Sequence, residues 1–342
     1  MTPSTMRAAV LYDVDDIRIE ERDVPQLRDG ELLVQTMASG ICSGDVMAWY
    51  IRRKAPLVLG HEPAGVVAAV AGEAAFAVGD RVFVHHHAPC FECRACKRGE
   101  HVQCSTWRAT KIEPGGLAQY FRVSRENQRD TLALPAGVPF RDAALVEPLA
   151  CVVKSLRRSG VRAGDRLYII GLGVMGQLHV LAAAALRVQV YGSDFVEGRR
   201  DIAQANGAVA FHPDEVERVL PEGADAVICG PGSVPAMEAA ARAAAGGGTI
   251  VMFTPFPPDV AVTLDSTRFY FGDLRLVASY SCGPNDTRAA LSLIERGIVT
   301  AQRVGASFFA LDDVPRAYRE LAEARIVKPI VCFDEPATNR TF

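Results

Sequence analysis

The chain has 342 residues, of which 49% are hydrophobic and 23% charged, a composition that excludes a disordered, collagen-like or coiled-coil protein. Its 37 Lys and Arg residues against 40 Asp and Glu residues give a formal net charge of −3, so the chain carries no electrostatic signature for nucleic acid or an anionic membrane. We expect two domains and a small-molecule partner.

The sequence indicates a protein of the reducing cytoplasm. It contains no run of about 20 apolar residues, and the residues after Met1 lack the apolar core of a signal peptide, so we expect neither membrane insertion nor export. Four of the nine cysteines crowd between Cys90 and Cys104. This pattern is more typical of metal ligands than of the disulfide framework of a small secreted domain.

The first part of the chain reads as a β-rich domain. From residue 6 to residue 41, β-branched and polar residues alternate between Gly and Pro breaks, which predicts short antiparallel strands. Further strands are predicted at residues 65–70 and 80–84.

After about residue 150 the pattern changes to alternating strands and helices. We expect a buried strand at residues 166–171, a helix at 177–186 and a strand at 188–194. Strands at 226–229 and 249–253 follow, with an Ala-rich helix between them. The sequence therefore predicts an α/β protein whose second domain is a doubly wound parallel sheet. We also expect helices and a strand in the C-terminal tail. Their pattern alone is compatible with either domain.

A glycine-rich segment follows the first strand of the parallel sheet and opens its first helix. It reads Gly171-Leu172-Gly173-Val174-Met175-Gly176. Gly171 permits a tight turn, Gly173 lets backbone N–H groups approach a pyrophosphate, and Gly176 lets helix and strand pack closely, with the helix N-terminus facing the negative charge. An ordinary turn also explains such glycines, but the strand–helix context favours dinucleotide binding.

Asp194 ends the next strand, at the separation typical of the acidic residue that binds the adenine ribose. A carboxylate there accepts hydrogen bonds from the ribose hydroxyls and repels a 2′-phosphate, which favours NAD over NADP. Arg199 and Arg200 lie nearby and weaken that preference. Gly230, in the loop after a later strand, is a candidate to lie beside the nicotinamide, although an ordinary turn explains it equally well.

Cys90, Cys93, Cys96 and Cys104 lie within fifteen residues of one loop. Four thiolates suit a closed tetrahedral zinc site, which folds a lobe that has little core of its own. Iron–sulfur clusters also use closely spaced cysteines, but no other electron-transfer signature accompanies these. A fully ligated zinc is structural and does no chemistry.

Four further residues are candidate metal ligands that are far apart in the sequence. They are Cys42, the adjacent His61 and Glu62, and Glu147. Ordinary structural roles also explain three of them: Cys42 suits a small core residue, His61 a hydrogen-bonded histidine, and Glu147 a carboxylate at a helix start.

Taken in chain order, these motifs resemble those of the zinc-dependent medium-chain alcohol dehydrogenases. The motifs are Gly40-Ile41-Cys42-Ser43-Gly44-Asp45, Gly60-His61-Glu62-Pro63-Ala64-Gly65, the cysteine quartet, Glu147-Pro148-Leu149 and the glycine-rich segment. The acidic residue at 147 makes the chain most similar to the polyol (sorbitol-like) and threonine dehydrogenase branch. The resemblance covers nearly the whole chain.

The resemblance implies a fold and two zinc ions per chain. A GroES-like catalytic domain would comprise residues 1–152 and 288–342, with a Rossmann domain at 153–287 between them. Cys42, His61 and Glu147 would hold a catalytic zinc, Glu62 would assist, and water or substrate would take the remaining position. The cysteine quartet would hold the second, structural zinc.

The same resemblance implies an alcohol dehydrogenase. Zinc would stabilise the alkoxide of a secondary, polyol-like alcohol, which would give its hydride to NAD, and the reverse reaction would reduce a ketone or aldehyde. The family usually pairs Rossmann sheet edges, so a homodimer or homotetramer is expected, with residues 276–280 as a candidate edge strand.

The sequence departs from the family pattern where the proton relay usually begins. Those positions hold Gly44 and Met47, so Ser43 becomes a candidate for the hydroxyl role, and His85, His86 and His87 include a possible relay base or are structural histidines. These departures motivate two alternatives. One is an NAD-using epimerase or cyclase without net oxidation, and the other is a non-catalytic, zinc-stabilised dinucleotide sensor.

The resemblance implies that two segments line the substrate cleft. Residues 49–54 combine two aromatic and three basic side chains, and the second segment contains Trp107, Arg108 and Lys111. Their charge suits a carboxylate- or phosphate-bearing alcohol, and a solvated basic face is equally compatible with the pattern.

Overall fold

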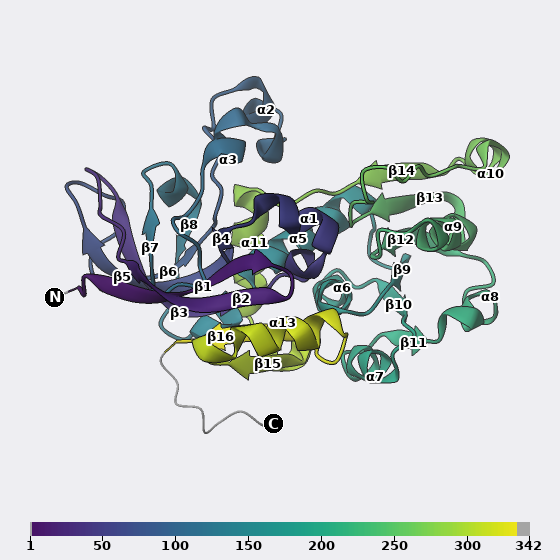
Figure 1. Ribbon diagram of the computed structural model, residues 1–342. Coiled ribbons are helices and arrows are strands. Elements are labelled where there is room, and N and C mark those ends of the chain that lie inside the picture. The colour runs from purple at the N-terminus through teal and green to yellow at the C-terminus, as the bar shows by residue number, and fades with distance from the viewer. Residues whose placement is uncertain (1, 334–342) are drawn as a thin grey trace. The chain divides into compact units, whose positions relative to one another are not determined.

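A computed structural model describes residues 2–333 of the chain. The chain forms two units, which are described separately below (Figure 1). Unit 1 contains the residues up to Pro148 and those from Cys282 onward, and unit 2 contains Leu149–Ser281. Residues 334–342, part of the expected C-terminal segment, lie outside the described residues. No helix within residues 2–333 has the length and apolar character that crossing a membrane requires.

Unit 1 is built on two β-sheets. Within the described residues, one sheet has the strand order β2-β1-β4, and the other has the order β15-β16-β3-β5-β6-β8, with β7 also pairing with β3. The strands are β1 (Thr5–Asp13), β2 (Asp16–Asp23), β3 (Leu32–Gly40), β4 (Leu57–Val58), β5 (Glu62–Val70), β6 (Arg81–Val84), β7 (Tyr120–Val123), β8 (Thr131–Ala133), β15 (Ala306–Phe309) and β16 (Lys328–Cys332).

The helices of unit 1 are short except near its C-terminal end. They are η1 (Ser43–Val46), α1 (Ala48–Ile51), η2 (Arg52–Lys54), α2 (Arg94–Lys97), η3 (His101–Gln103), α3 (Ser105–Ala109), η4 (Asn127–Asp130), α4 (Phe140–Ala143), α11 (Pro284–Glu295), α12 (Ala301–Val304), η6 (Leu311–Asp313) and α13 (Val314–Ala322). Helix α5 (Val146–Ser159) begins in unit 1 and continues into unit 2.

Strand β3 is central to the larger sheet. It pairs antiparallel with β5 and β7, and its last residues pair antiparallel with β16. Most of its side chains are buried, which explains its apolar sequence. Strand β16 comes from a segment almost 290 residues later in the chain, so the C-terminal residues complete the sheet that β3 begins.

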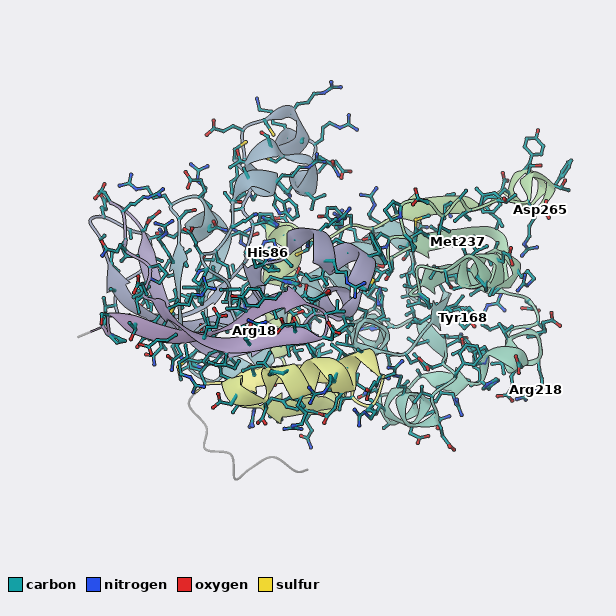
Figure 2. All side chains as sticks on the ribbon, viewed as in Figure 1. Arg18, His86, Tyr168, Arg218, Met237 and Asp265 are labelled. Atoms are coloured by element: carbon teal, nitrogen blue, oxygen red, sulfur yellow. The ribbon has the colours of Figure 1, made fainter. Side chains whose placement is uncertain are left out.

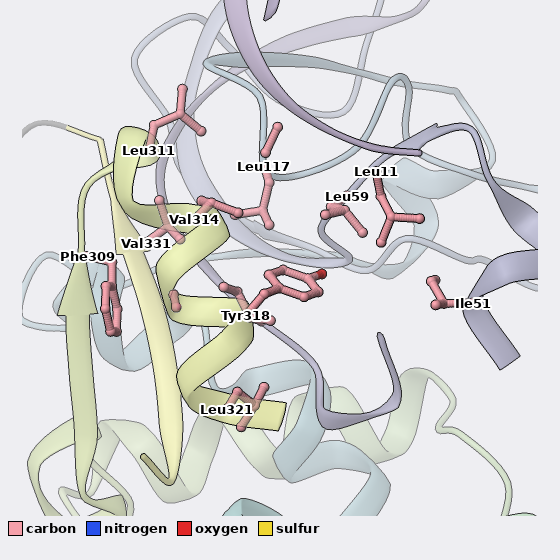
Figure 3. Packing of buried hydrophobic residues seen from close by; sticks show 13 residues of the cluster. Leu11, Ile51, Leu59, Leu117, Phe309, Leu311, Val314, Tyr318, Leu321 and Val331 are labelled. Atoms are coloured by element: carbon pink, nitrogen blue, oxygen red, sulfur yellow. The ribbon is translucent and has the colours of Figure 1, made fainter. Parts of the chain in front are cut away.

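One hydrophobic core of unit 1 forms under α13 (Figure 3). Tyr318 of α13 packs there with Leu11 of β1, Leu59, and Ile51 of α1. The Tyr318 hydroxyl donates a hydrogen bond to Asp45 Oδ2 at 3.5 Å. This core therefore reaches η1, the short helix that follows Cys42.

Unit 2 contains a six-stranded parallel sheet with the order β11-β10-β9-β12-β13-β14, all within described residues. Its elements are β9 (Arg166–Ile170), α6 (Val174–Ala184), β10 (Gln189–Ser193), α7 (Glu197–Ala205), β11 (Val209–Phe211), η5 (Pro213–Glu215), α8 (Val216–Val219), β12 (Ala224–Cys229), α9 (Val234–Ala243), β13 (Ala244–Met252), α10 (Ser266–Phe271) and β14 (Arg275–Ala278). Tyr168 of β9 and Met237 of α9, labelled in Figure 2, belong to its core.

The predicted α/β class is confirmed, with a β-rich unit and a parallel doubly wound sheet. The strands expected at residues 65–70, 80–84 and 166–171 lie in β5, β6 and β9. The helix expected at 177–186 spans Val174–Ala184 in the structure. Its first residues belong to the glycine-rich segment, whose glycines favour a turn in the sequence pattern.

Candidate functional site

Cys42, His61 and Glu62 come together because of the register of two strands. In the β3–β5 pair Gly40 lies opposite Glu62, so the residues just outside this end of the ladder become neighbours. One ligand atom from each of Cys42, His61 and Glu62 lies within 4.8 Å of the others. Gly60 has φ +94°, and a Cβ there would lie 2.4 Å from the backbone nitrogen of Leu117, so glycine is required beside His61.

Negative charge concentrates around this group. Burial raises the pKa of the Cys42 thiol, although His61 opposes that shift. For His61, burial disfavours the imidazolium, but the negative charges of Asp45 and Cys42 outweigh burial and raise the pKa well above its usual value. Asp45 Oδ2 lies 3.6 Å from His61 Nδ1. A partly buried set of sulfur, nitrogen and oxygen donors that favours a positive charge at its centre fits a divalent zinc ion.

Lys328 orients the carboxylate of Glu62. Its Nζ forms an ion pair with Glu62 Oε2 and donates a hydrogen bond to the Ile41 carbonyl at 3.0 Å, and both charged side chains are 1% exposed. The other oxygen, Glu62 Oε1, is buried and has no hydrogen-bond partner among residues 2–333. A buried carboxylate oxygen without a donor fits a metal ligand, because such an oxygen is otherwise costly to bury.

Glu147 belongs to an adjacent group. It lies in the first turn of α5, and its carboxylate is within 4.8 Å of a ring nitrogen of His85 and of His86, which follow β6. The negative charge of Glu147 contributes to raising the pKa of His61, and burial raises the pKa of Glu147 itself. The resemblance places Glu147 with Cys42 and His61; in the structure the tight group around those two residues contains Glu62.

His86 belongs to the group of Glu147 and His85, and its ring lies near that of His61 in the first group. Its ring centroid is 5.0 Å from that of His61, and its Nδ1 is buried without a hydrogen-bond partner in the described part of the chain. Burial lowers its pKa well below the usual value, and neighbouring positive charges add to this shift. His86 is therefore a neutral imidazole at neutral pH.

The other two histidines of the run are held by hydrogen bonds. His87 Nδ1 donates to the Thr110 carbonyl at 2.5 Å, and its ring packs on Trp107 with centroids 4.1 Å apart. His85 Nδ1 lies 2.6 Å from Asp130 Oδ2. None of the three histidines belongs to a strand, because β6 ends at Val84.

Sequence reasoning missed a buried network that fixes His85. Thr287 Oγ1 donates to Asp130 Oδ1 at 2.8 Å, and Cys282 Sγ lies 3.6 Å from His85 Nε2. His85, Asp130, Cys282 and Thr287 are all fully buried. These residues span about 200 positions, so no local spacing could have revealed them. The ring of His86, in contrast, lies beside that of His61.

The cysteine quartet forms a second candidate metal site. The sulfur of Cys90 lies 3.6 Å from Cys104 Sγ and 3.9 Å from Cys96 Sγ, and Cys93 Sγ lies 3.6 Å from Cys96 Sγ. Four ligands at a Zn–S distance of about 2.3 Å are roughly 3.8 Å apart in a tetrahedron. None of the nine cysteines, all within the described residues, forms a disulfide. The quartet therefore fits a closed structural zinc site.

The electrostatics of the quartet favour thiolates at two positions. Burial alone would raise the pKa of Cys104, but a hydrogen bond from the Cys90 backbone N–H and other donors lower it to about 6. Backbone N–H groups of Glu92 and Cys93 lower the pKa of Cys90. Burial raises the pKa of Cys96 to about 12, so this fourth ligand depends on the metal for its deprotonation.

In unit 2, the glycine-rich segment forms a tight connection between β9 and α6. Gly171 has φ +89°, and a Cβ on Gly176 would lie 2.1 Å from the Gly171 carbonyl oxygen. Gly173 is the N-cap of α6, and Val174 and Met175 begin its first turn. Gly230 follows β12, where a Cβ would lie 2.5 Å from the Ile170 carbonyl oxygen. A helix N-terminus reached through such glycines is suited to a pyrophosphate.

Asp194, directly after β10, is 8% exposed and holds this segment in place. Its Oδ2 accepts a hydrogen bond from the Leu172 N–H and its Oδ1 one from the Val196 N–H, both at 2.8 Å. Arg199 Nη1 lies 3.6 Å from Asp194 Oδ2. Arg200 instead donates to the Asp194 and Phe195 carbonyls. Arg199 thus pairs with the Asp194 side chain, and Arg200 binds its backbone carbonyl.

Comparison with known proteins identifies both units. The alcohol dehydrogenase GroES-like domain matches residues 28–136, and the zinc-binding dehydrogenase domain matches residues 174–296. D-xylulose reductase A of Aspergillus oryzae is 28% identical over 351 residues, which cover 94% of this chain and 95% of that protein.

Solved structures share the fold. A protein described as a zinc-binding dehydrogenase from Sinorhizobium meliloti 1021, bound to NADP, has a TM-score of 0.86 and 28% identity, covering 96% of this chain and 100% of that one. The 2R,3R-butanediol dehydrogenase of Bacillus subtilis has a TM-score of 0.84 over 96% of this chain and 99% of that one. At 22% identity, the latter shows the fold alone.

The two domain matches follow the order of the sequence motifs. Cys42, His61 and the cysteine quartet lie in the first match, and most of the second match lies in the parallel-sheet unit. The alternatives of an epimerase, a cyclase or a sensor find no support in these matches. The chain belongs to the zinc-dependent medium-chain alcohol dehydrogenases, enzymes that use zinc and a nicotinamide cofactor.

Proposed function

We propose that the protein oxidises a secondary hydroxyl of a polyol-type alcohol with NAD and reduces the corresponding ketone in the reverse direction. The group formed by Cys42, His61 and Glu62 carries this proposal, because its mixed donors suit a catalytic rather than a closed structural zinc. The relative named D-xylulose reductase A supports a polyol and its ketose as the substrate pair.

We assign the catalytic metal to Cys42 and His61, with Glu147 and Glu62 supplying carboxylate oxygen. The buried, donor-free Glu62 Oε1 and the buried Glu147 carboxylate fit this role. A zinc ion there supplies a Lewis acid that lowers the pKa of a hydroxyl group. Lys328 holds Glu62 in position, and the neutral His86 ring borders the place where the substrate binds.

We assign proton transfer to Ser43. Its side chain is partly buried in η1, immediately after Cys42, whereas Gly44 and Met47 have no group that carries a proton. A hydroxyl both donates and accepts, so Ser43 can pass a proton from the substrate toward solvent.

The glycine-rich segment and Asp194 support NAD as the cofactor. Backbone N–H groups of Gly173, Val174 and Met175 would bind the pyrophosphate. Asp194 keeps acceptor capacity for ribose hydroxyls, and its charge opposes a 2′-phosphate. Arg199 pairs with that carboxylate, which reduces its capacity to bind a 2′-phosphate, and Gly230 would lie at the nicotinamide end.

The test is reduced-cofactor formation by absorbance, with zinc-loaded protein, NAD or NADP, and a panel of polyols, amino alcohols, hydroxy acids and simple alcohols. We expect turnover with a polyol and a higher kcat/KM with NAD. Cys42→Ala loses a metal ligand, so kcat should fall by at least a hundredfold and bound zinc from two to one per chain. NADH binding should be retained, because the glycine-rich segment is unchanged.

Cys332→Ser is the matched control, because it removes a thiol outside both metal groups. It should retain two zinc ions and full turnover. Unimpaired turnover in Cys42→Ala, or oxidation of no alcohol at all by protein that binds both zinc and NADH, would contradict the proposal.

We also propose a homo-oligomer in the reducing cytoplasm. Strand β14 ends the six-stranded sheet and is available to pair with another copy, and Tyr270 and Phe271 beside it are about four-fifths exposed. All nine cysteines are thiols, as a reducing compartment maintains them. A sedimentation mass equal to one chain, 36.8 kDa, would contradict the oligomer.

A further inference from the structure

A group of aromatic and cationic side chains lies on α1 and η2, a few residues after Cys42. Ile51 of α1 is 1% exposed and anchors the helix in the core (Figure 3). Its neighbours Trp49 and Tyr50 are half-buried outside that core, and Arg53 and Lys54 are exposed. We call these four residues the 49–54 cluster.

The two cations of the 49–54 cluster pack on its rings. The Arg53 guanidinium carbon lies 5.7 Å from the Trp49 ring centroid and 5.5 Å from that of Tyr50, and Lys54 Nζ lies 3.6 Å from the Tyr50 centroid. The rings themselves meet edge to face, 5.8 Å apart. Cation–π contacts hold these side chains in place without neutralising their charge.

Neither cation of the cluster has an acidic partner among residues 2–333. This distinguishes them from their neighbour Arg52, whose Nε donates to Asp13 Oδ1 at 2.7 Å. Other arginines of the same unit are also paired, as in Arg18 with Asp16 and Arg22 with Glu20. Arg53 and Lys54 therefore keep their hydrogen-bond donors available for an anion from outside the chain.

The 49–54 cluster lies beside the candidate catalytic group. Helix α1 packs on η1, which begins directly after Cys42. Burial lowers the pKa of Lys54, while the negative charges of Asp45 and Cys42 act to raise it. In turn the Lys54 charge contributes to lowering the pKa of His86, after burial and the neighbouring histidines. Lys54 is thus within electrostatic reach of the residues that would bind the reacting hydroxyl.

We propose that Arg53 and Lys54 bind an anionic group of the substrate, a phosphate ester or a carboxylate, so that the physiological alcohol is an acidic derivative of a polyol. The planar guanidinium offers paired donors to such a group, and the ammonium adds a point charge. Trp49 and Tyr50 orient both cations. This inference rests on the proposed function, because the reacting hydroxyl must reach Cys42 and His61 while the anion occupies the cluster.

Anion binding can be measured without turnover, with inorganic phosphate as the probe. The chain has two tryptophans; Trp107 is 2% exposed, whereas Trp49 contacts Arg53. Phosphate should change the tryptophan emission of zinc-loaded protein at constant ionic strength, and Trp49→Phe should abolish that change. The Arg53→Gln/Lys54→Gln double variant should raise the phosphate Kd at least tenfold.

Arg52→Gln is the control, since it removes one positive charge from the same turn at a residue engaged by Asp13. It should leave the phosphate Kd within twofold of the unmodified protein. An emission change that is absent, that survives in Trp49→Phe, or that weakens as much in Arg52→Gln as in the double variant would overturn the inference.

Steady-state kinetics then identify the anion. A polyol, its phosphate monoester and its aldonic acid are compared as substrates. We expect one of the two anionic substrates to have at least a tenfold higher kcat/KM than the parent polyol, mainly through KM, and the double variant to remove most of that ratio. A monoester preference assigns a phosphate and an aldonic acid preference a carboxylate, whereas equal kcat/KM for all three would overturn the inference.

The two proposals fail in different ways. If neutral polyols are oxidised in a Cys42-dependent manner without any anion preference, only the substrate class is wrong. If no alcohol is oxidised, the proposed function is wrong, and the phosphate titration still decides whether the 49–54 cluster binds anions.

Discussion

The ion pair between Lys328 and Glu62 is buried within the strands that carry the candidate metal ligands. Both side chains are 1% exposed, and a Cβ on Gly40 would lie 1.8 Å from Glu62 Oε2, so glycine leaves the room that the pair occupies. A buried pair adds little net stability relative to apolar residues of the same size, but removal of one partner is costly. The pair therefore serves to fix the orientation of Glu62.

Lys328→Met should lower the free energy of unfolding by about 3–5 kcal/mol, because the Glu62 charge is left buried without a partner. Denaturant unfolding of the metal-free protein measures this loss. The Lys328→Met/Glu62→Gln double variant should recover most of it. Arg316→Met, which removes exposed ion pairs with Asp313 and Glu320, should cost less than about 1 kcal/mol. Equal losses in the two single variants would show that Glu62 is not held by Lys328.

His179 of α6 should make the protein sensitive to acid. Burial lowers its pKa to about 4, and its ring nitrogens bond to the Met175 carbonyl at 2.7 Å and Ser155 Oγ at 3.0 Å. Between pH 6.5 and about 4 the unfolded chain therefore binds a proton at this residue that the folded chain does not. The contribution of His179 to the free energy of unfolding is fully present above pH 6.5. Below pH 6.5 it falls by about 1.4 kcal/mol per pH unit.

The measurement is the melting temperature at pH 7 and pH 5 for the unmodified protein and for His179→Gln. The variant should lose less stability than the unmodified protein between these two pH values. His212→Gln, at a histidine with 38% side-chain exposure, should reproduce the unmodified pH profile. An identical profile in all three proteins would contradict the assignment.

At the scale of residues, the sequence was informative wherever chemistry followed a local spacing. The cysteine quartet has such a spacing, and its four sulfurs lie within 4.8 Å of one another. Cys42 and His61 were joined only through the resemblance, since the β3–β5 register is not visible in either segment alone. Lys328, Asp130 and Thr287 could not be predicted, because each has a hydrogen-bond partner between 45 and 287 positions away in the sequence.

At the scale of elements, the buried strands of the parallel sheet and its edge strand β14 were predicted, whereas two other short edge strands, β11 and β15, were not. Strands β9, β10, β12 and β13 contain the expected apolar runs. Strand β11 has only three residues, of which Val209 is half exposed, so it carries no recognisable period. Strand β15 was missed for the same reason, since three of its four residues are only partly buried.

The tight connection between β9 and α6 predicts that one methyl group added at Gly176 weakens NADH binding. Gly176→Ala would place a Cβ 2.1 Å from the Gly171 carbonyl oxygen and separate the helix N-terminus from the strand. We expect the Kd for NADH, measured by its fluorescence, to rise at least tenfold. Gly198→Ala in α7, where no heavy atom lies within 4 Å of the new Cβ, should bind NADH normally. Normal binding by Gly176→Ala would contradict the close approach.

At the scale of the whole molecule, one lobe of the described chain has a small core that includes its own candidate metal ligands. The small cluster of Cys96, Val102, Cys104 and Trp107 is the buried core of the lobe formed by α2, η3 and α3, with Cys90 and Cys93 packed against it. So few apolar side chains cannot offset the conformational entropy of ordering the lobe. Zinc binding must supply the remaining free energy.

Cys96→Ser should therefore remove one zinc ion per chain and open the lobe to proteolysis between residues 90 and 109. NADH binding should be unchanged, because the glycine-rich segment belongs to unit 2. Metal analysis, limited proteolysis and NADH fluorescence test these outcomes, with Cys332→Ser as the control. Retention of two zinc ions with an intact lobe would show that Cys96 is not a ligand.

The pairing of β3 with β16 has a consequence for biosynthesis. Unit 2 is one continuous stretch of chain, so it can fold as soon as it leaves the ribosome, whereas unit 1 remains incomplete until its last strands emerge. Until then the C-terminal half of β3 lacks its β16 partner, and Glu62 lacks Lys328. An unfinished chain thus exposes a strand edge that invites aggregation, and its candidate metal ligands reach their final arrangement only after β16 has emerged.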